Sequence, residues 1–335
     1  MIRVHTMNPT KTEREHVCFQ IVKHYPFLAD TLGCGISSWQ SAIKYRFKNL
    51  RKTRQVSSGN GTAVVKPEMK RRKCEAVETE NGETDETCKE HVQQLKREMS
   101  KLSHRNYGLI GNLMEATYMY RRKRILENPV SINNVVQEYP ALQLVSEIKA
   151  EFSRILGKEK IVRNMTAAFN TMQSNVFRLA MAKGVLKDSN IKNLVEEFPS
   201  RQSEIEGMAC LIAVPILLRE TGPDSAVLKI CSENESIDQS IKESIFPRLV
   251  GSSSLEDIDP LYIAAEGKII SKLSGLNVDA AVAIALLMGA FYIFNVQYPN
   301  KSKNTYIFLE SKILQNKTKE ANRRVIVQKL LKELE

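Results

Sequence analysis

Histidine is scarce in this sequence, and the residue patterns that usually position a nucleophile are missing. Only five of the 335 residues are histidine, and all lie in the first third of the chain: His5, His16, His24, His91 and His104. Serine, threonine and cysteine nucleophiles need a nearby base. No G-x-S-x-G, P-loop or G-x-G-x-x-G pattern is present to hold a nucleophile or a phosphate. We therefore expect a protein that is not an enzyme and needs no cofactor.

Closely spaced cysteine pairs are also missing. Six cysteines are scattered along the chain without a C-x-x-C pair, which favours free thiols in a reducing compartment over a disulfide framework. Cys18, His24 and Cys34 are the one set that could meet as metal ligands, but their spacing matches no common zinc pattern. The sequence predicts no metal site.

Long hydrophobic runs are limited to one segment. Residues 280–294 form an uncharged run of fifteen residues, whereas a membrane-spanning helix needs about twenty. We expect this segment to be a buried core helix and the protein to have no membrane partner. The first sixteen residues contain no apolar stretch of signal-peptide length, so we expect an intracellular protein.

Charge is abundant and very unevenly distributed. Residues 1–73 hold fifteen Lys or Arg against four Asp or Glu, which accounts for the whole net charge of +11. The other 262 residues carry 34 groups of each sign. A segment this basic is attracted to nucleic acid, anionic lipid or acidic protein surfaces.

Two helices are predicted in an N-terminal module, residues 1–55. The first runs from Thr12 to His24 and is ended by Tyr25-Pro26. The second begins at Ser37 or Ser38 and has a buried stripe of Trp39, Ile43, Phe47 and Leu50. Its other faces are cationic, and the residues predicted to contact nucleic acid are Lys44, Lys48, Arg51, Lys52 and Arg54. We expect Trp39 and Phe47 to hold the module together rather than to stack on bases.

A linker is predicted at residues 56–90, because this segment is first basic, then acidic, and poor in apolar residues. Its basic part resembles a monopartite nuclear localisation signal, formed by Lys66, Lys70, Arg71, Arg72 and Lys73. A solvated spacer is the alternative interpretation of the same residues.

The rest of the chain predicts a mainly α protein. Apolar residues recur at helical spacing through a body at residues 91–315, with a small antiparallel sheet near 225–272 and a charged helix at 316–335. Pro215 is expected to kink or break the helix that contains it. The run Arg121-Arg122-Lys123-Arg124 is a second basic patch, which we interpret as a solvated helix end.

Several segments, in order, resemble the vertebrate sterile alpha motif domain-containing protein 3-like family, which is especially numerous in fish. They are Tyr25-Pro26-Phe27-Leu28 with Trp39 and Phe47 to Arg51, Arg121-Arg122-Lys123, Glu138 to Leu142, Pro215 to Glu220, and residues 286–299. The resemblance implies a shared architecture more than an activity, and no copy of the sterile alpha motif itself is visible in this chain. Separately, the helix with Trp39 and Phe47 to Arg51 resembles the closing helix of MADF or Myb-like DNA-binding modules.

Two functions are consistent with these patterns. The first is a nuclear binding protein whose basic module contacts nucleic acid while the helical body contacts proteins. The second is a protein-interaction scaffold, nuclear or cytoplasmic, whose basic face binds acidic proteins.

Overall fold

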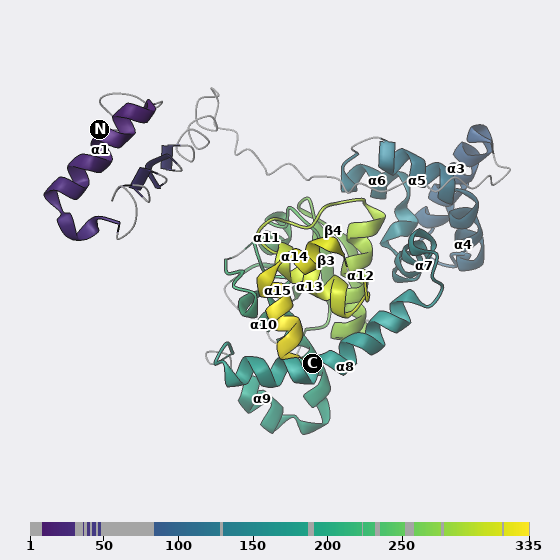
Figure 1. Cartoon of the computed structure of the whole chain (residues 1–335). Helices are drawn as coiled ribbons and strands as arrows, with labels where there is room; N and C mark the ends of the chain where they lie inside the picture. The colour runs from purple at the N-terminus through teal and green to yellow at the C-terminus, as the bar shows by residue number, and fades with distance from the viewer. Residues whose placement is uncertain are drawn as a thin grey trace. The chain divides into compact units, whose positions relative to one another are not determined.

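The chain divides into two compact units, residues 1–65 and 66–335. The computed structural model describes residues 9–30, 36, 39–40, 42–44, 46–47, 84–127, 130–186, 191–222, 224–231, 235–251, 258–275, 278–316 and 318–334 (Figure 1). We call residues 1–65 the N-terminal unit and residues 66–335 the larger unit.

The N-terminal unit begins with helix α1 (Lys11–His24), as predicted. A capping box starts this helix: the Glu13 amide donates to Thr10 Oγ1 over 3.3 Å, and the Thr10 amide donates to Glu13 Oε2 over 2.6 Å. The 3₁₀ helix η1 (Pro26–Leu28) follows. Trp39 Nε1 donates a 2.8 Å hydrogen bond to the Leu28 carbonyl, so the indole ties the second helical segment to η1. Trp39 therefore has the structural role expected of it.

In the first half of the larger unit, every described secondary-structure element is a helix. Short polar side chains start several helices, since Thr84, Asn106 and Ser131 each accept a hydrogen bond from a first-turn amide. The elements are α3 (Asp85–Ser100), α4 (Tyr107–Ala116), α5 (Tyr118–Glu127), α6 (Ile132–Glu138), η2 (Pro140–Gln143), α7 (Val145–Leu156), α8 (Ile161–Ala182), α9 (Ile191–Glu197), η3 (Pro199–Arg201) and α10 (Gln202–Leu217). The predicted linker falls largely outside the described residues, and its last six residues, 85–90, belong to α3.

A four-stranded sheet follows, in the order β1 (Leu228–Ile230), β2 (Arg248–Gly251), β3 (Leu261–Ala265) and β4 (Lys268–Leu273). Strands β3 and β4 pair antiparallel, as predicted, with a hairpin turn at Glu266-Gly267, where both residues have positive φ. Strand β2, which the sequence did not predict, pairs antiparallel with β3. Strand β1 pairs with β2 in parallel, so the sheet is mixed rather than purely antiparallel. The crossover between these two strands contains helix α11 (Ile237–Lys242).

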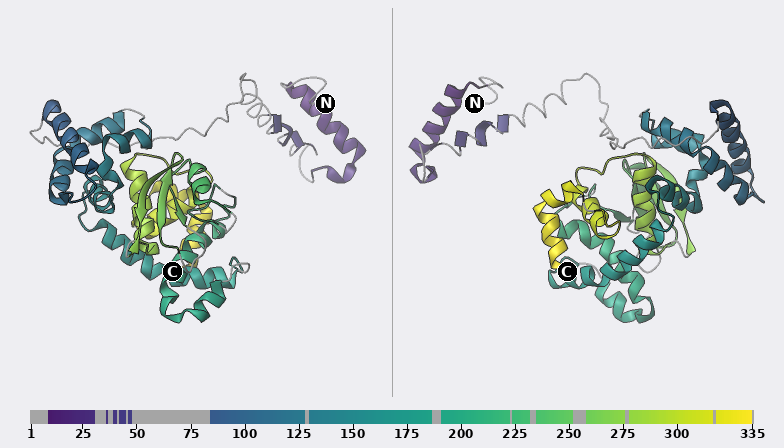
Figure 2. Two further views of the ribbon diagram at one scale, coloured as in Figure 1. Left: turned by 180° about the vertical axis from the view of Figure 1, so that it is seen from behind. Right: turned by 45° about the vertical axis from the view of Figure 1, so that its right-hand side comes forward.

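Helix α12 (Ala280–Ile293) is the centre of the core, which confirms the expectation for the apolar run at 280–294. Every residue of this helix except Val282 is buried. It packs against α7, α8 and α10, and Gly289 allows close approach to Phe152 of α7. Seen from behind, the sheet lies in front of α12 and the C-terminal helices (Figure 2). Among the described residues, no helix combines the length and apolar character that crossing a membrane requires.

The chain ends in three helices, α13 (Lys303–Lys312), α14 (Lys319–Arg323) and α15 (Val325–Glu333). The predicted C-terminal helix is thus divided in two, with the break at Arg324. Pro215 lies in the last turn of α10, and the helix continues to Leu217. Proline has no amide to donate to the carbonyl four residues earlier, and α10 ends two residues beyond Pro215.

One local structure occurs three times among the described residues. A helix ends at an aromatic residue with φ between −131° and −120° and ψ between 65° and 75°, and proline then opens a 3₁₀ helix. The aromatic amide donates to the carbonyl four residues earlier over 2.8 Å in each copy. The aromatic residues are Tyr25, Tyr139 and Phe198. We call this structure the aromatic–proline corner; the sequence similarity between residues 21–28 and 135–142 marks the first two copies.

Candidate functional site

The basic residues predicted to bind nucleic acid are only partly described. Lys44 is exposed on a helical segment whose Trp39, Ile43 and Phe47 are half-buried, as the predicted stripe requires. The remaining predicted contacts lie outside the described residues: Lys48, Arg51, Lys52 and Arg54. The same holds for the proposed localisation signal, Lys66, Lys70, Arg71, Arg72 and Lys73.

The candidate metal ligands are not brought together among the described residues. Cys18 is fully buried within α1, and Cys34 lies outside the described residues. Burial raises the pKa of the Cys18 thiol, which disfavours the thiolate that binds metal. In the part of the chain that the structure describes, no group of three or more His, Cys, Asp or Glu side chains could hold a metal ion.

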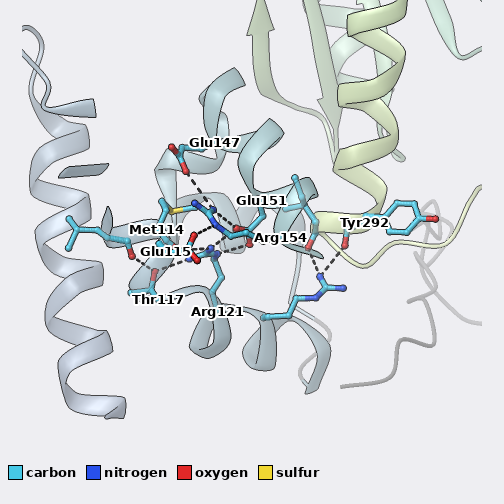
Figure 3. A network of polar contacts seen from close by, with 11 residues as sticks. Met114, Glu115, Thr117, Arg121, Glu147, Glu151, Arg154 and Tyr292 are labelled. Atoms are coloured by element: carbon cyan, nitrogen blue, oxygen red, sulfur yellow. Dashed lines mark hydrogen bonds and ion pairs between the residues drawn. The ribbon is translucent and has the colours of Figure 1, made fainter. Parts of the chain in front are cut away.

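The most organised group of polar side chains is a buried network centred on Arg121 of α5 (Figure 3). Its guanidinium binds Glu151 of α7 through both carboxylate oxygens, at 2.9 Å from Nε and 2.6 Å from a terminal nitrogen. The same group donates to Thr117 Oγ1 at 2.8 Å and to the Met114 carbonyl at 3.0 Å. Arg121 is fully buried, and the Tyr139 ring centroid lies 5.4 Å from its guanidinium carbon. Arg121 thus joins α4, α5 and α7.

Arg154 extends this network toward the surface. Its side chain pairs with Glu151 at 3.0 Å, with Glu115 at 2.5 Å and with Glu147 at 3.8 Å. Two guanidinium groups therefore face three carboxylates, which leaves one negative charge in excess. Glu147 has the longest ion pair, and burial raises the pKa of its carboxyl although Arg154 opposes this. Among the three carboxylates, Glu147 is consequently the one whose charged form is least favourable.

Arg122, next to Arg121, binds a different part of the core. It donates to the carbonyls of Tyr292 and Ile293 at 3.0 and 3.1 Å, at the carboxyl end of α12. The unpaired carbonyls and the dipole at a helix C-terminus favour such a cation. The solvated helix end predicted for this run is therefore wrong for Arg121 and Arg122, which are buried; only Lys123 and Arg124 are exposed.

Sequence reasoning missed this network because its members are far apart along the chain. Glu147, Glu151 and Arg154 share one face of α7, beside the buried stripe that contains Ile148 and Phe152. Two carboxylates next to an apolar stripe are a weak signal of a buried cationic partner. The spacing does not identify that partner as Arg121.

The comparisons with known proteins agree with this architecture. A family model described as "Sterile alpha motif domain-containing protein 3, helical domain" matches residues 68–144. The chain is 21% identical to the mouse and 20% identical to the human protein named sterile alpha motif domain-containing protein 3, in each case over 92% of its length. The predicted resemblance is therefore confirmed. The chain spans about 60% of the length of these curated relatives. No solved structure matches the chain.

The residues that carry the resemblance to the sterile alpha motif domain-containing protein 3-like proteins have structural roles. Arg121 and Arg122 make the buried contacts described above, and Tyr139 packs against Arg121. Glu220 accepts hydrogen bonds from the Asn304 and Thr305 amides at 2.7 and 2.9 Å, so it caps the start of α13. The run at residues 286–299 includes most of α12. In this chain, these residues thus belong to the core and to the charges that organise it.

Replacing Arg121 by Met tests the central ion pair. Removing one partner of a buried pair leaves a poorly compensated charge, so we expect Arg121→Met to lower the free energy of unfolding by about 3–5 kcal/mol. Arg124→Met is the matched control, since its pair with Glu138 is exposed and should contribute less than about 1 kcal/mol. Urea unfolding should be followed by far-UV circular dichroism, because the one tryptophan, Trp39, reports on the N-terminal unit. Equal losses in the two variants would contradict a central role for Arg121.

Glu147→Gln tests the excess negative charge through its pH dependence. A carboxyl whose pKa is raised by folding destabilises the fold as pH rises through its unfolded and folded pKa values. We expect Glu147→Gln to raise the melting temperature at pH 7 and the gain to shrink toward pH 4, where the wild-type carboxyl becomes protonated. Glu115→Gln, which removes an exposed carboxylate from the same network, should give no such gain. A lower melting temperature for Glu147→Gln at pH 7 would show that the carboxylate stabilises the fold.

Proposed function

We propose that this chain is a non-enzymatic nuclear protein whose basic N-terminal segment contacts nucleic acid and whose larger unit contacts other proteins. The observation that carries the proposal is the separation of charge. The whole excess of +11 lies in residues 1–73. Beyond this segment, by contrast, Arg121, Arg122 and Arg154 are directed into the fold and bind carboxylates and carbonyls.

The second helical segment of the N-terminal unit supplies a face suited to phosphate. Lys44 and Arg46 are exposed there, while Trp39, Ile43 and Phe47 are half-buried. Lys48 and Arg51 follow Lys44 in the sequence by four and seven residues, a spacing that places side chains on one helical face. Cations on one face neutralise successive phosphates and release their counterions, which gives binding with little sequence preference.

A protein-interaction scaffold is the second candidate, because acidic side chains satisfy the same cations as phosphate does. An exposed aromatic surface on the N-terminal unit, formed by Phe19, Tyr25 and Phe27, favours a protein partner for at least part of this unit. The two candidates differ in whether the cationic residues bind nucleic acid at all.

Nucleic-acid binding can be tested with a charge variant of the full chain. We expect the protein to shift DNA and RNA oligonucleotides at low salt in a mobility-shift assay. A variant with five cations changed to Ala should bind them at least ten-fold more weakly; the five are Lys44, Lys48, Arg51, Lys52 and Arg54. With about five phosphate contacts, the logarithm of the affinity should fall with the logarithm of salt concentration at a slope of roughly −4 to −5.

The matched control for this experiment removes five exposed cations of the larger unit, Lys89, Arg97, Lys123, Lys268 and Lys272. This variant has the same net charge and should keep its affinity. Fluorescence of Trp39 verifies that the N-terminal unit stays folded in both proteins. Failure of the wild type to bind any oligonucleotide at low salt would favour the scaffold.

Localisation tests the nuclear part of the proposal. We expect the tagged full-length protein to accumulate in the nucleus and a variant with Lys70, Arg71, Arg72 and Lys73 changed to Ala to lose this accumulation, because an exposed cationic run is what import receptors bind. A cytoplasmic wild-type protein would remove the nuclear assignment and favour the scaffold.

A further inference from the structure

The N-terminal unit carries exposed aromatic side chains on α1 and on the corner that follows it. Phe19, Tyr25 and Phe27 have exposed fractions of 59%, 55% and 81%. The rings of Tyr25 and Phe27 meet edge to face, with centroids 6.2 Å apart. Isolated apolar side chains are common on protein surfaces, but three large aromatic residues on one helix and the corner that follows it are not. We call the pair of Tyr25 and Phe27, whose rings touch, the Tyr25–Phe27 surface.

The same corner occurs inside the larger unit, where it is covered. Tyr139, Ala141 and Leu142 of the second aromatic–proline corner are each at most 1% exposed. Elements α3, α7 and β4 all pack against η2. Val92 and Leu95 of the amphipathic helix α3 belong to the same hydrophobic core as Leu142. Within this chain, an amphipathic helix is thus part of what covers such a corner.

A groove beside α1 continues the Tyr25–Phe27 surface. It has a volume of about 580 Å³, and its described lining is His16, Val17, Gln20, Ile21, His24 and Tyr25. These residues recur at intervals of three and four, so they form a ridge-and-groove pattern along one face of the helix. A second helix can place its own ridge in such a groove and bring its end onto Tyr25 and Phe27.

The net charge of the N-terminal unit determines which kind of helix it attracts. Residues 1–65 hold ten Lys or Arg against three Asp or Glu, a net charge of +7. Two copies of this unit would repel each other, whereas a helix with acidic residues would be attracted. Helix α3, which covers the second corner, has Asp85 and Glu86 in its first turn.

We propose that the Tyr25–Phe27 surface and the adjoining groove dock an amphipathic, acidic α-helix of another protein. Apolar side chains of that helix at positions i, i+3 or i+4 and i+7 enter the groove, and Phe27 and Tyr25 are the principal anchors. Acidic residues at the rim face the cations of the unit and raise the rate of association.

The probe is a peptide based on residues 84–101, a sequence with four acidic and four basic residues. Lys89→Glu and a staple that replaces the exposed Gln93 and Arg97 make it acidic and hold it helical, and Cys88→Ser removes its thiol. Its binding to the full-length protein is measured by fluorescence anisotropy at low salt. We expect saturable binding that Phe27→Ser weakens at least ten-fold. Leu102→Ser is the matched control, because Leu102 is fully exposed on the larger unit, and it should leave the affinity unchanged. A peptide of scrambled sequence should not bind.

Phe27 is exposed, so Phe27→Ser should not unfold the N-terminal unit. The fluorescence of Trp39 verifies that the variant remains folded. The proposal is overturned if the stapled peptide does not bind, or if Phe27→Ser binds it as tightly as the wild type. It is also overturned if Phe27→Ser abolishes binding of a single-stranded oligonucleotide and leaves the peptide unaffected, because the rings then stack on bases. Self-association of the wild type that Phe27→Ser removes would assign the surface to a second copy of the chain.

Discussion

The buried pair between Arg121 and Glu151 is the constraint on which the helical half of the larger unit depends. A guanidinium without access to water must have its donors satisfied, and here one carboxylate, one hydroxyl and one carbonyl satisfy them. These acceptors come from α4, the turn that follows it, and α7. Moving any one of these elements would leave a charge or a donor buried without a partner. The ion pair therefore specifies the packing of these helices as well as contributing to its energy.

Arg122 connects this helical half to the C-terminal half of the larger unit. Consecutive residues on a helix point about 100° apart, so Arg121 faces α7 while Arg122 faces the end of α12. The central apolar helix is in this way fixed at its carboxyl end by a side chain 170 residues earlier. The family model ends at residue 144. The matched segment therefore contains Arg121 and Arg122, while the Glu151 carboxylate and the carbonyls at the end of α12 lie beyond it.

The sequence predicted those features that depend on local patterns. Helical periodicity identified α1 and the helices from α4 to α10, the uncharged run at 280–294 identified α12, and Glu266-Gly267 identified the hairpin. Strand β2 was missed because Pro247 precedes it and Gly251 ends it, which leaves Leu249 and Val250 as its only apolar side chains. The parallel pairing of β1 depends on a crossover that no local pattern encodes. Arg121 and Arg122 were misassigned because four adjacent cations suggest solvent. Their acceptors lie 30 and 170 residues away, beyond the reach of periodicity. For the nucleic-acid site that we propose, the described structure adds the exposure of Lys44 and the half-buried stripe of Trp39, Ile43 and Phe47.

The aromatic–proline corner is held by its own backbone hydrogen bonds and by the fixed φ of proline, so its shape does not depend on what lies against it. The residue after the proline is Phe27 in the first copy, Ala141 in the second and Ser200 in the third, and the three backbones nevertheless agree closely. That position can therefore change in size and polarity without disturbing the turn. Where this position is exposed, as at Phe27 and Ser200, a single substitution can therefore add or remove a surface contact without altering the turn.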